Sequence, residues 1–497
     1  MYKFFKYFII IIFFSWDVNS EENNYYKLVP EVDSNWKSNV NKKSVGRNFV
    51  IVSANKYATL GAKKILELGG NAVDASVTLQ LILGLVEPQS SGLGGGSFAL
   101  YFDKKSKKVF NYDGRESAPE KISPDVFLDK FGKPKKFFDA ALGGQSVGVP
   151  GTLETLFKMH KEFGLLNWNS LIQPVIELSE KGFVPPKRLI KSLTKEKFLW
   201  KNISDDNFLN FILEDPNELV RNYEYSKTLK EIAIEHRDFY EGRIANKIIS
   251  KVRKSKLNPG ILSHKDMSSY KVEKTQALCT ELSKFKICGP QLPSSGGIAI
   301  TQALILFENY KFSPKKKVFQ KIQDIMSFIY NERDLYLADS NFEKVNEKKL
   351  LNRKYLIEKF RIFLTKKEFS EINASRTKFN STSHFSIYDK FGNNLTMTSS
   401  IENRFGSRIF VEGFFLNNQL TDFSFKNKSG NIPIKNRVAG GKKPLSSMTP
   451  IIILDKNDNF LFSTGSPGGI AIISYVLKSI IDIMYLNLDP LVSISQG

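Results

Sequence analysis

The stretch that most constrains the fold of this chain is NSTSHFSIYDKFGNNLTMTSSIEN, residues 380–403. Apolar residues alternate with polar ones on both sides of a turn at 389–393, a pattern typical of a two-stranded antiparallel hairpin. With the turn centred on Phe391, Thr382 and Ser400 face each other, because each lies nine positions from the centre. The polar face of this hairpin carries the following side chains: Thr382, His384, Ser386, Thr398, Ser400 and Glu402.

Two interpretations of this polar face stay open on the sequence alone. A row of hydroxyls on a hairpin is commonly a solvated surface. The alternative is a nucleophile at the head of a strand. If the Ser381–Thr382 peptide bond were cut, the new α-amine of Thr382 would have an ordinary pKa of about 7.7–8.0 and could act as the base for its own hydroxyl.

Nucleophiles of other kinds have little support in the sequence. There are four histidines, His160, His236, His264 and His384, and no G-x-S-x-G elbow, so a Ser-His-Asp triad is possible but unsupported. The two cysteines, Cys279 and Cys288, have no histidine nearby, which excludes a zinc site built on them. They lie in two short predicted strands joined by a tight turn, and we expect them to form a structural disulfide.

Of three turns rich in small residues, two are candidate binding elements. In TGSPGG (464–469) a strand runs into glycines that open a helix, so the amides of Gly468 and Gly469 predict either an oxyanion hole or a simple turn. PLSSMTP (444–450) places two hydroxyls before a buried strand and is a possible carboxylate cradle. GLGGGS (92–97) lacks the ending of a phosphate-binding loop and is interpreted as a structural turn.

The N-terminus and the charge distribution indicate export rather than nucleic-acid binding. Two lysines precede an apolar run from Tyr7 to Trp16, which predicts a signal peptide over residues 1–20 and a periplasmic or secreted protein. An uncleaved N-terminal anchor is the alternative interpretation of this run. No later segment is predicted to span a membrane. The net charge is +21, but the lysines are scattered, which argues against a nucleic-acid partner.

Strand and helix patterns interleave without a strict βαβ rhythm, which predicts an α/β sandwich. Several segments, in this order along the chain, also resemble the γ-glutamyltranspeptidase family from about residue 48 to about residue 485. They include LELGGNAVDASVTLQLILGLVEPQSSGLGGGSFALYFD, YDGRESAP, GGQSVGVPGTLETLFKMHKEFG, LPSSGGIAITQAL, TSHFSIYDKFGNN, FFLNNQLTDFS, KPLSSMTP and STGSPGG.

The resemblance implies a four-layer αββα sandwich of the N-terminal-nucleophile hydrolase type. It implies self-cleavage into a large chain, 21–381, and a small chain, 382–497, which together form one heterodimeric catalytic domain. The implied activity is transfer of the γ-glutamyl group of glutathione or related amides to water, amino acids or peptides. No metal and no organic cofactor are implied.

The resemblance also assigns roles to individual residues. Thr382 matches the nucleophile, Ser400 a residue that hydrogen-bonds the nucleophile's amine, and Gly468 and Gly469 the oxyanion-hole glycines. The residues that match the substrate-binding positions are Arg115, Ser446 and Ser447 for the α-carboxylate and Gln419, Asp422 and Glu402 for the α-amine. His384 is expected to be a structural neighbour of the site rather than the base.

Three departures from the family pattern stand out. Glu402 stands where many members have asparagine, and the segment between Asp422 and Pro444 is shorter than the lid loop of typical members. The chain also stops soon after the helix that follows Gly469, which suggests a truncated C-terminus. Two alternatives therefore remain: an acylase of the same fold that cleaves glutaryl-like or poly-γ-glutamyl amides, and an unprocessed, non-enzymatic envelope binding protein.

Overall fold

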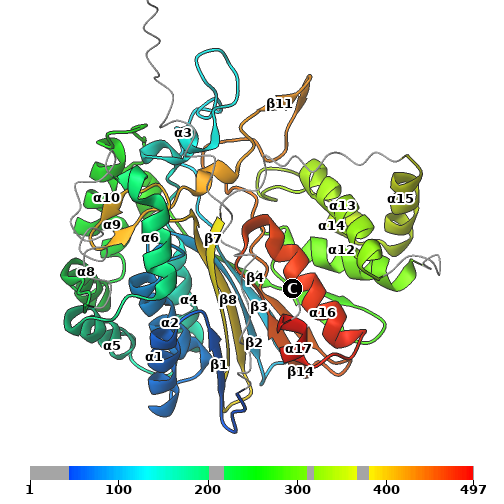
Figure 1. Cartoon of the computed structure of the whole chain (residues 1–497), viewed down its shortest axis with the longest axis horizontal. Coiled ribbons are helices and arrows are strands. Elements are labelled where there is room, and N and C mark those ends of the chain that lie inside the picture. Colours follow the sequence, from blue (N-terminus) through cyan, green and yellow to red (C-terminus); the bar gives the residue numbers. More distant parts are fainter. Residues whose placement is uncertain (1–43, 201–217, 311–317, 367–379, 496–497) are drawn as a thin grey trace, which may run out of the picture.

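Two antiparallel sheets packed face to face form the centre of the molecule in the computed structural model, which describes residues 44–200, 218–310, 318–366 and 380–495 (Figure 1). The six-stranded sheet has the order β1-β7-β8-β2-β3-β4, and the four-stranded sheet has the order β14-β13-β6-β5. The strands of the first sheet are β1 (Val50–Ser53), β7 (Asn380–Tyr388), β8 (Asn394–Asn403), β2 (Gly96–Asp103), β3 (Lys108–Gly114) and β4 (Glu273–Gln276). The strands of the second are β14 (Phe460–Thr464), β13 (Ile451–Leu454), β6 (Lys286–Gly289) and β5 (Leu278–Glu281).

The central strands β2 and β13 are apolar on both faces because both of their faces are covered. In β2, Leu100 and Phe102 point between the sheets, whereas Ala99 and Tyr101 point to the outer helices. In β13, Ile452 and Leu454 meet the first sheet, whereas Ile451 and Ile453 meet the other helical layer. This period of two, with apolar side chains on each face, is the pattern of a strand buried between two layers.

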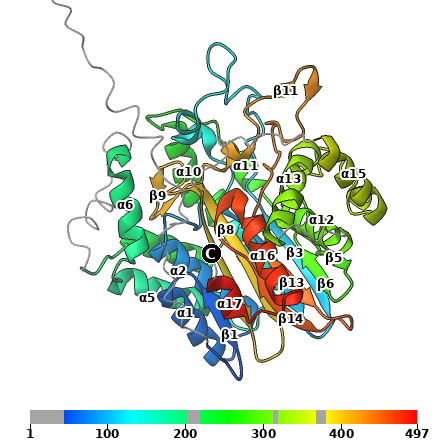
Figure 2. The same ribbon diagram turned by 45° about the vertical axis from the view of Figure 1, so that its right-hand side comes forward.

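Helices cover the outer face of each sheet (Figures 1 and 2). The helices packed with the six-stranded sheet include α1 (Lys56–Glu67), α2 (Ala72–Val86), α4 (Thr152–Phe163), α5 (Trp168–Lys181), α6 (Lys187–Trp200), α8 (Tyr223–Ile234), α9 (Asp238–Glu241), α10 (Arg243–Arg253) and α11 (His264–Ser268). Those packed with the four-stranded sheet are α12 (Gly296–Asn309), α13 (Val318–Tyr336), α15 (Arg353–Lys366) and α16 (Ile472–Met484). The layers are therefore helix, sheet, sheet, helix, which confirms the predicted αββα sandwich.

Short elements complete the described chain. They are α3 (Phe137–Ala141), α14 (Glu347–Leu350), α17 (Pro490–Ser495), β9 (Phe410–Val411), β10 (Phe414–Phe415), β11 (Lys428–Ser429), β12 (Ile432–Pro433), η2 (Gly144–Ser146), η4 (Gln419–Asp422) and η5 (Gly469–Ala471). The predicted turn at 92–97 enters β2 with the backbone of Gly94 packed against that of Phe415, where an added Cβ would lie 2.1 Å from the Phe415 carbonyl oxygen.

The hairpin of β7 and β8 has the predicted register. Thr382 is paired with Ser400, and Tyr388 with Asn394, around a turn centred on Phe391. In that turn the Asp389 carboxylate accepts hydrogen bonds from the amides of Phe391 and Asn393, and from the amide of Ala72 at the start of α2. The turn chemistry of one aspartate thus fixes both the register of the hairpin and its position against the helical layer.

The polar face of the hairpin is buried between the two layers rather than solvated. Phe385, Ile387, Leu395 and Met397 point to the helices around α2, so the hydroxyl-bearing residues point the opposite way, toward the second sheet. Every residue of β8 is buried, and Thr382 is only 2% exposed. The solvated-surface interpretation is therefore wrong, because a second sheet covers this face.

The disulfide prediction is confirmed. Cys279 on β5 and Cys288 on β6 lie directly opposite each other in the antiparallel pair and are bonded. The bond joins the edge strand of the four-stranded sheet to its neighbour.

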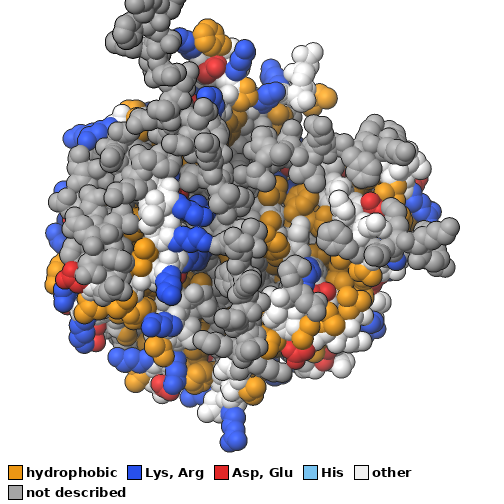
Figure 3. Space-filling model, in the orientation of Figure 1, with side chains coloured by type: hydrophobic (Ala, Val, Ile, Leu, Met, Phe, Trp, Pro, Cys, Tyr) orange, Lys and Arg blue, Asp and Glu red, His pale blue; other side chains and the backbone are white. Residues whose placement is uncertain are grey.

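Basic side chains are scattered over the surface of the described residues, as the lysines are scattered along the sequence. On the face shown in Figure 3, Lys and Arg side chains lie around the molecule with apolar side chains between them, and one short row runs over α6 and α1. Among the described residues, no helix combines the length and apolar character needed to cross a bilayer, and no cluster of three potential metal ligands occurs. The predicted signal peptide lies outside the described residues.

Candidate active site

A cavity of about 960 Å³ opens where β7 and β8 meet the loops at one end of the sandwich. It brings together nearly all of the site residues predicted from the sequence. The predicted residues that line it are Thr382, Ser400, Arg115, Glu402, Gln419, Asp422, Ser446, Ser447 and Gly469. Gly468 does not line it, and Arg333 lines it although the sequence analysis did not single out that residue.

The hydroxyl of Ser400 connects the predicted nucleophile to the predicted cleavage bond. It donates to the carbonyl oxygen of Ser381 at 2.8 Å and accepts from the amide of Glu402 at 2.9 Å. The Thr382 hydroxyl lies 3.3 Å from the same Ser400 oxygen. Because a serine has one hydroxyl hydrogen, which here goes to Ser381, Thr382 is left as the donor in its contact with Ser400.

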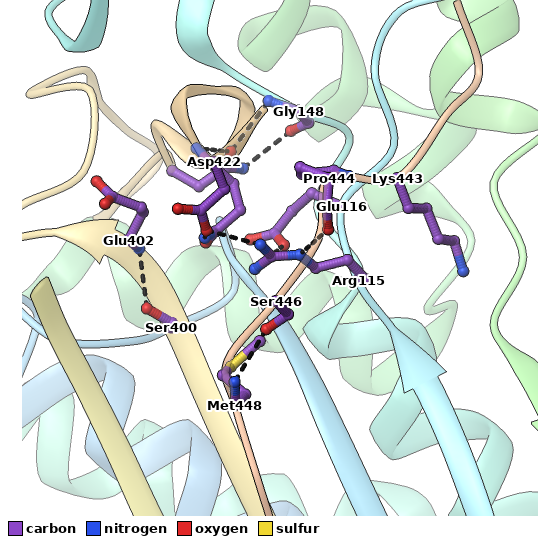
Figure 4. A network of polar contacts seen from close by, with 12 residues as sticks. Arg115, Glu116, Gly148, Ser400, Glu402, Asp422, Lys443, Pro444, Ser446 and Met448 are labelled. Atoms are coloured by element: carbon purple, nitrogen blue, oxygen red, sulfur yellow. Dashed lines mark hydrogen bonds and ion pairs between the residues drawn. The ribbon is translucent and has the colours of Figure 1, made fainter. Parts of the chain in front are cut away.

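Glu402 holds an uncommon backbone conformation beside this group. Its φ is +75°, in the left-handed region that residues other than glycine rarely adopt. This conformation lies at the register shift near the end of β8, and the Glu402 amide donates to the Ser400 hydroxyl (Figure 4). The Glu402 carboxylate accepts a 2.5 Å hydrogen bond from the side-chain amide of Asn418, which fixes it in the cavity wall.

Arg115 is the buried cation of the site and is 1% exposed. Its Nε donates to the Pro444 carbonyl at 3.0 Å, and its Nη2 donates to the Leu445 carbonyl at 3.1 Å and to Asp422 Oδ2 at 2.7 Å. Its own amide donates to Asp113 Oδ1 at 2.8 Å, so the residue is held at backbone and side chain. In Figure 4 its guanidinium lies between Asp422 and Ser446.

The short helix η4 supplies Gln419 and Asp422, the residues expected to bind the α-amine. Gln419 Nε2 donates to Asp422 Oδ2 at 2.7 Å, the same oxygen that accepts from Arg115. The backbone amide of Gln419 donates to Asn417 Oδ1 at 3.0 Å, which fixes the start of η4. Asp422 therefore lies between a cation and an amide donor, and its side chain keeps 20% exposure toward the cavity.

Ser446 and Ser447 lie on the loop that leads into β13. The Ser446 hydroxyl accepts from the Met448 amide at 3.1 Å, and the Ser446 carbonyl accepts from the amide and the hydroxyl of Ser295. The Ser447 hydroxyl accepts from Arg333 Nη2 at 3.0 Å. Both hydroxyl oxygens are therefore occupied as acceptors, and both residues line the cavity near Arg115.

The glycines that follow β14 form the entrance to α16. Gly468 has a φ of +130°, which is open only to glycine in practice, and an added Cβ would lie 2.9 Å from the Tyr475 ring. Within the described part of the chain, neither the Gly468 nor the Gly469 amide donates a backbone hydrogen bond. Such amides at the start of a helix are available to a negatively charged atom.

His384 lies on β7, two residues after Thr382, and is held in the neutral form. Its Nδ1 is 2.9 Å from the Thr398 hydroxyl, and its ring packs so closely under Gly465 that an added Cβ there would lie 2.1 Å from it. Desolvation lowers the pKa of His384 to about 3. A neutral ring with hydroxyl partners agrees with the expected structural role.

Glu116 is a second buried acid that the sequence analysis did not single out. Its Oε2 lies 3.8 Å from Arg115 Nη1, and burial raises its pKa to about 8 despite that cation. The carboxyl fills the space above Gly96, where an added Cβ would lie 2.4 Å from Oε2, and Gly96 pairs with Ser400. A protonated Glu116 at pH 7 adds no second negative charge beside Arg115, whose Nη2 already contacts Asp422.

Two loops form the outer wall of the cavity. One is the segment 423–436, whose small hairpin of β11 and β12 projects beyond the sheets (Figures 1 and 2). The other is the stretch 134–138 that leads into α3. These loops line the cavity with Phe137, Phe138, Phe423, Phe425, Ile434, Lys135, Lys136 and Lys426. The shortened lid inferred from the resemblance stays a prediction, and the segment concerned is part of this wall.

Comparisons with known proteins agree with this geometry. A γ-glutamyltranspeptidase family model matches residues 58–497. The chain is 32% identical to the glutathione hydrolase proenzyme of Bacillus subtilis strain 168 over 466 residues, which cover 88% of this chain and 78% of that protein. It is also 32% identical to the glutathione hydrolase proenzyme of Escherichia coli K12 over 459 residues, which cover 87% and 77%.

Solved structures show the shared fold. A cephalosporin acylase from Bacillus halodurans superimposes with a TM-score of 0.76 at 21% identity, covering 90% of this chain and 83% of that one. Helicobacter pylori γ-glutamyltranspeptidase is 28% identical with a TM-score of 0.59, covering 65% of this chain and 93% of that one. From these matches and the site geometry, we conclude that the chain belongs to the γ-glutamyltranspeptidase family.

Proposed function

We propose that this protein is an autoprocessing γ-glutamyltransferase and glutathione hydrolase with Thr382 as its nucleophile. It transfers the γ-glutamyl group of glutathione or related γ-glutamyl amides to water, amino acids or peptides. The observation that carries the proposal is the Ser400 hydroxyl, which contacts the Thr382 hydroxyl and donates to the Ser381 carbonyl in one cavity wall. The printed names of the relatives support the substrate class.

Processing is the first step of the proposed mechanism. The Thr382 oxygen attacks the Ser381 carbonyl carbon, its proton passes to the leaving amide nitrogen, and the C–N bond breaks to give an ester and a free amine. Water then hydrolyses the ester, which releases the Ser381 carboxyl group and restores the Thr382 hydroxyl. The Ser400 hydroxyl, 2.8 Å from the Ser381 oxygen, stabilises the negative charge that develops there.

Turnover uses the amine that processing creates. The neutral α-amine takes the proton of the Thr382 hydroxyl, and the oxygen attacks the γ-carbonyl carbon of the donor. The leaving amine takes that proton as the C–N bond breaks, and water or an acceptor amine then cleaves the γ-glutamyl ester. Gly468 and Gly469 supply amides for the oxyanion, since Gly469 lines the cavity and both lie at a helix start.

Recognition of the glutamyl group follows from the charges around the cavity. The α-carboxylate binds at Arg115 with the hydroxyls of Ser446 and Ser447, because a guanidinium and two donors suit a planar anion. The α-ammonium binds at Asp422, Gln419 and Glu402. The Asp422 carboxylate supplies the counter-charge, and the Gln419 amide oxygen accepts a hydrogen bond. A family-typical asparagine is replaced by Glu402, and a carboxylate there also accepts from an ammonium group.

Two cleavages of the precursor belong to the proposal, one before Thr382 and one after the signal peptide. Residues 21–381 form the large chain and residues 382–497 the small chain of a heterodimer, and the two share the six-stranded sheet because β7 and β8 lie between β1 and β2. Removal of the signal peptide, 1–20, precedes folding in the periplasm or outside the cell.

Intact mass measurement of the purified protein tests the proposal. The wild type is expected to give two fragments that separate before Thr382, and Thr382→Ala is expected to remain one chain without activity on γ-glutamyl-p-nitroanilide. Thr382→Ser keeps a hydroxyl and is the matched control, expected to be cut more slowly. A wild type that stays uncut and inert contradicts the enzyme proposal, and added glycylglycine separates transfer from hydrolysis.

A further inference from the structure

Arg333 is a second guanidinium at the carboxylate end of the cavity. It comes from α13, on the other side of the loop that carries Ser446 and Ser447, and its side chain is 12% exposed. Its Nε donates to the Ser295 hydroxyl at 2.9 Å and its Nη2 to the Ser447 hydroxyl at 3.0 Å. Asp334 Oδ1 lies 3.2 Å from its Nη1. From α13, Arg333 thus contacts the loop that carries Ser446 and Ser447 on the side of Ser295.

The contact with Arg333 sets the donor and acceptor roles of the Ser447 hydroxyl. A serine hydroxyl has one hydrogen and can accept at its oxygen. Because the guanidinium can only donate, the Ser447 oxygen must accept from Arg333, and the Ser447 hydrogen has no acceptor among the described residues. The Met448 amide likewise donates to the Ser446 hydroxyl oxygen, so the hydrogen of Ser446 is also without an acceptor among the described residues. Both hydroxyl hydrogens are therefore left for an anion.

Ser295 extends the same control to the backbone. Its hydroxyl accepts from Arg333 and donates to the Ser446 carbonyl at 2.7 Å, and its amide donates to that carbonyl at 2.9 Å. Arg333, Ser295 and the loop therefore form one connected group, and a change at Arg333 reaches both serines.

We propose that Arg333 is a positioning residue that orients the hydroxyl of Ser447, and through Ser295 the loop at Ser446, to donate to the α-carboxylate of the γ-glutamyl donor. This inference rests on the proposed function and adds a residue to its recognition site.

Steady-state kinetics of the processed enzyme test the inference with two substrates. The first is γ-glutamyl-p-nitroanilide. The second is 4-aminobutanoyl-p-nitroanilide, which keeps the amine and lacks the α-carboxylate. Arg333→Gln is expected to raise KM for the first substrate about tenfold, with kcat changed less than about twofold, and to leave the second unchanged. Arg333→Lys keeps a cationic donor and is expected to recover part of the loss.

A double-mutant cycle with Ser447→Ala separates positioning from direct binding. If Arg333 acts through Ser447, Arg333→Gln adds clearly less than its roughly tenfold effect to KM in the Ser447→Ala background, where only the route through Ser295 to the Ser446 loop is left. Arg361→Gln removes an exposed arginine from the neighbouring helix α15 and is the matched control, expected to leave KM unchanged.

Three results would overturn the inference. They are independent effects of Arg333→Gln and Ser447→Ala that add fully, an equal effect on the substrate without a carboxylate, and failure of both Arg333→Gln and Arg333→Lys to be processed. An inert wild type instead overturns the proposed function, so the two failures are distinguishable.

Discussion

The reacting half and the recognition half of the cavity are built in different ways. Thr382 and Ser400 lie 18 residues apart on one hairpin, and the ladder register alone brings their hydroxyls together. Arg115 and Asp422 are separated by 307 positions, and Arg333 and Ser447 by 114. One half is thus a local structure, and the other exists only when distant segments pack.

This difference predicts different consequences of mutation. Thr382 and Ser400 act on bond cleavage, because the Ser400 hydroxyl touches the Ser381 carbonyl and the Thr382 hydroxyl. Groups on the loops act on affinity for the donor, because they hold charge and hydrogen-bond donors where the glutamyl head binds. Variants that affect only processing and kcat, or only KM, therefore support this division of the cavity, and variants that change both contradict it.

Ser400→Ala is expected to have the largest effect. It removes the donor to the Ser381 oxygen, so self-cleavage should slow by about 100-fold, a magnitude typical of a lost oxyanion donor. The measurement is the time course of the two fragments by mass spectrometry. Ser399→Ala is the matched control, because Ser399 is the preceding residue of β8 and donates to Gln80 instead. Equal slowing in both variants would contradict the assignment.

Arg115→Gln is expected to raise KM for γ-glutamyl-p-nitroanilide by about 100-fold, since a buried charge-assisted contact to the carboxylate is lost. Processing should continue, because Arg115 does not touch Ser381 or Thr382. Arg115→Lys keeps the charge without the planar guanidinium, and its KM should lie between those of the wild type and Arg115→Gln. A fall in kcat at constant KM would place Arg115 in the reacting half and break the comparison.

Glu116 predicts a pH-dependent stability. Its pKa is raised from 4.5 to about 8 in the folded state, so between these values the folded protein holds a proton that the unfolded chain has lost. Stability therefore falls as pH rises through this window. Relative to Glu116→Gln, the free energy of unfolding of the wild type should drop by on the order of 1–3 kcal/mol from about pH 5 to about pH 8.

Urea unfolding of the uncut Thr382→Ala chain, with and without Glu116→Gln, provides this measurement in a single polypeptide. Parallel pH profiles for the two chains would show that Glu116 is ionised in the folded protein. The charge of Arg115 would then be partly cancelled before the substrate arrives.

The disulfide should have the smallest effect on activity. Cys279 and Cys288 lie on β5 and β6 and do not line the cavity. The double variant Cys279→Ser, Cys288→Ser is expected to keep KM and kcat while the free energy of unfolding drops by about 2–3 kcal/mol, the loop-closure value for a short loop. Reduction of the wild type by dithiothreitol should reproduce this loss. A changed KM would link the edge of the second sheet to the site.

The hairpin was readable from its sequence because strand pairing has a period of two and a turn fixes the register. Asp389 sets the turn, and the count from Phe391 then places Thr382 opposite Ser400. The same local logic predicted the pairing of Cys279 with Cys288. Ser446 and Ser447 stood out as two hydroxyls before a buried strand. The other residues of the recognition half, such as Arg115 and Asp422, came from motifs of the resembled family and not from any physical period in the chain.

Other features were beyond the sequence. Arg333 lies in an ordinary helical pattern, and only the packing of α13 behind the serine loop gives it partners there. Glu116 looks like any acid after an arginine until Gly96, on the adjacent strand, leaves room for its carboxyl. The one signal that pointed to Glu116 was its position directly after Arg115 in the motif DGRESAP.

The sequence by itself determined which hydroxyls pair across the hairpin, because that geometry depends on neighbours within 18 positions of each other. Tertiary structure alone decided that their face is buried, that Arg115, Arg333 and Asp422 share one cavity, and that Glu116 keeps its proton. These properties depend on which layers cover which face and on how far each charge is removed from water, and no local pattern in the chain encodes either quantity.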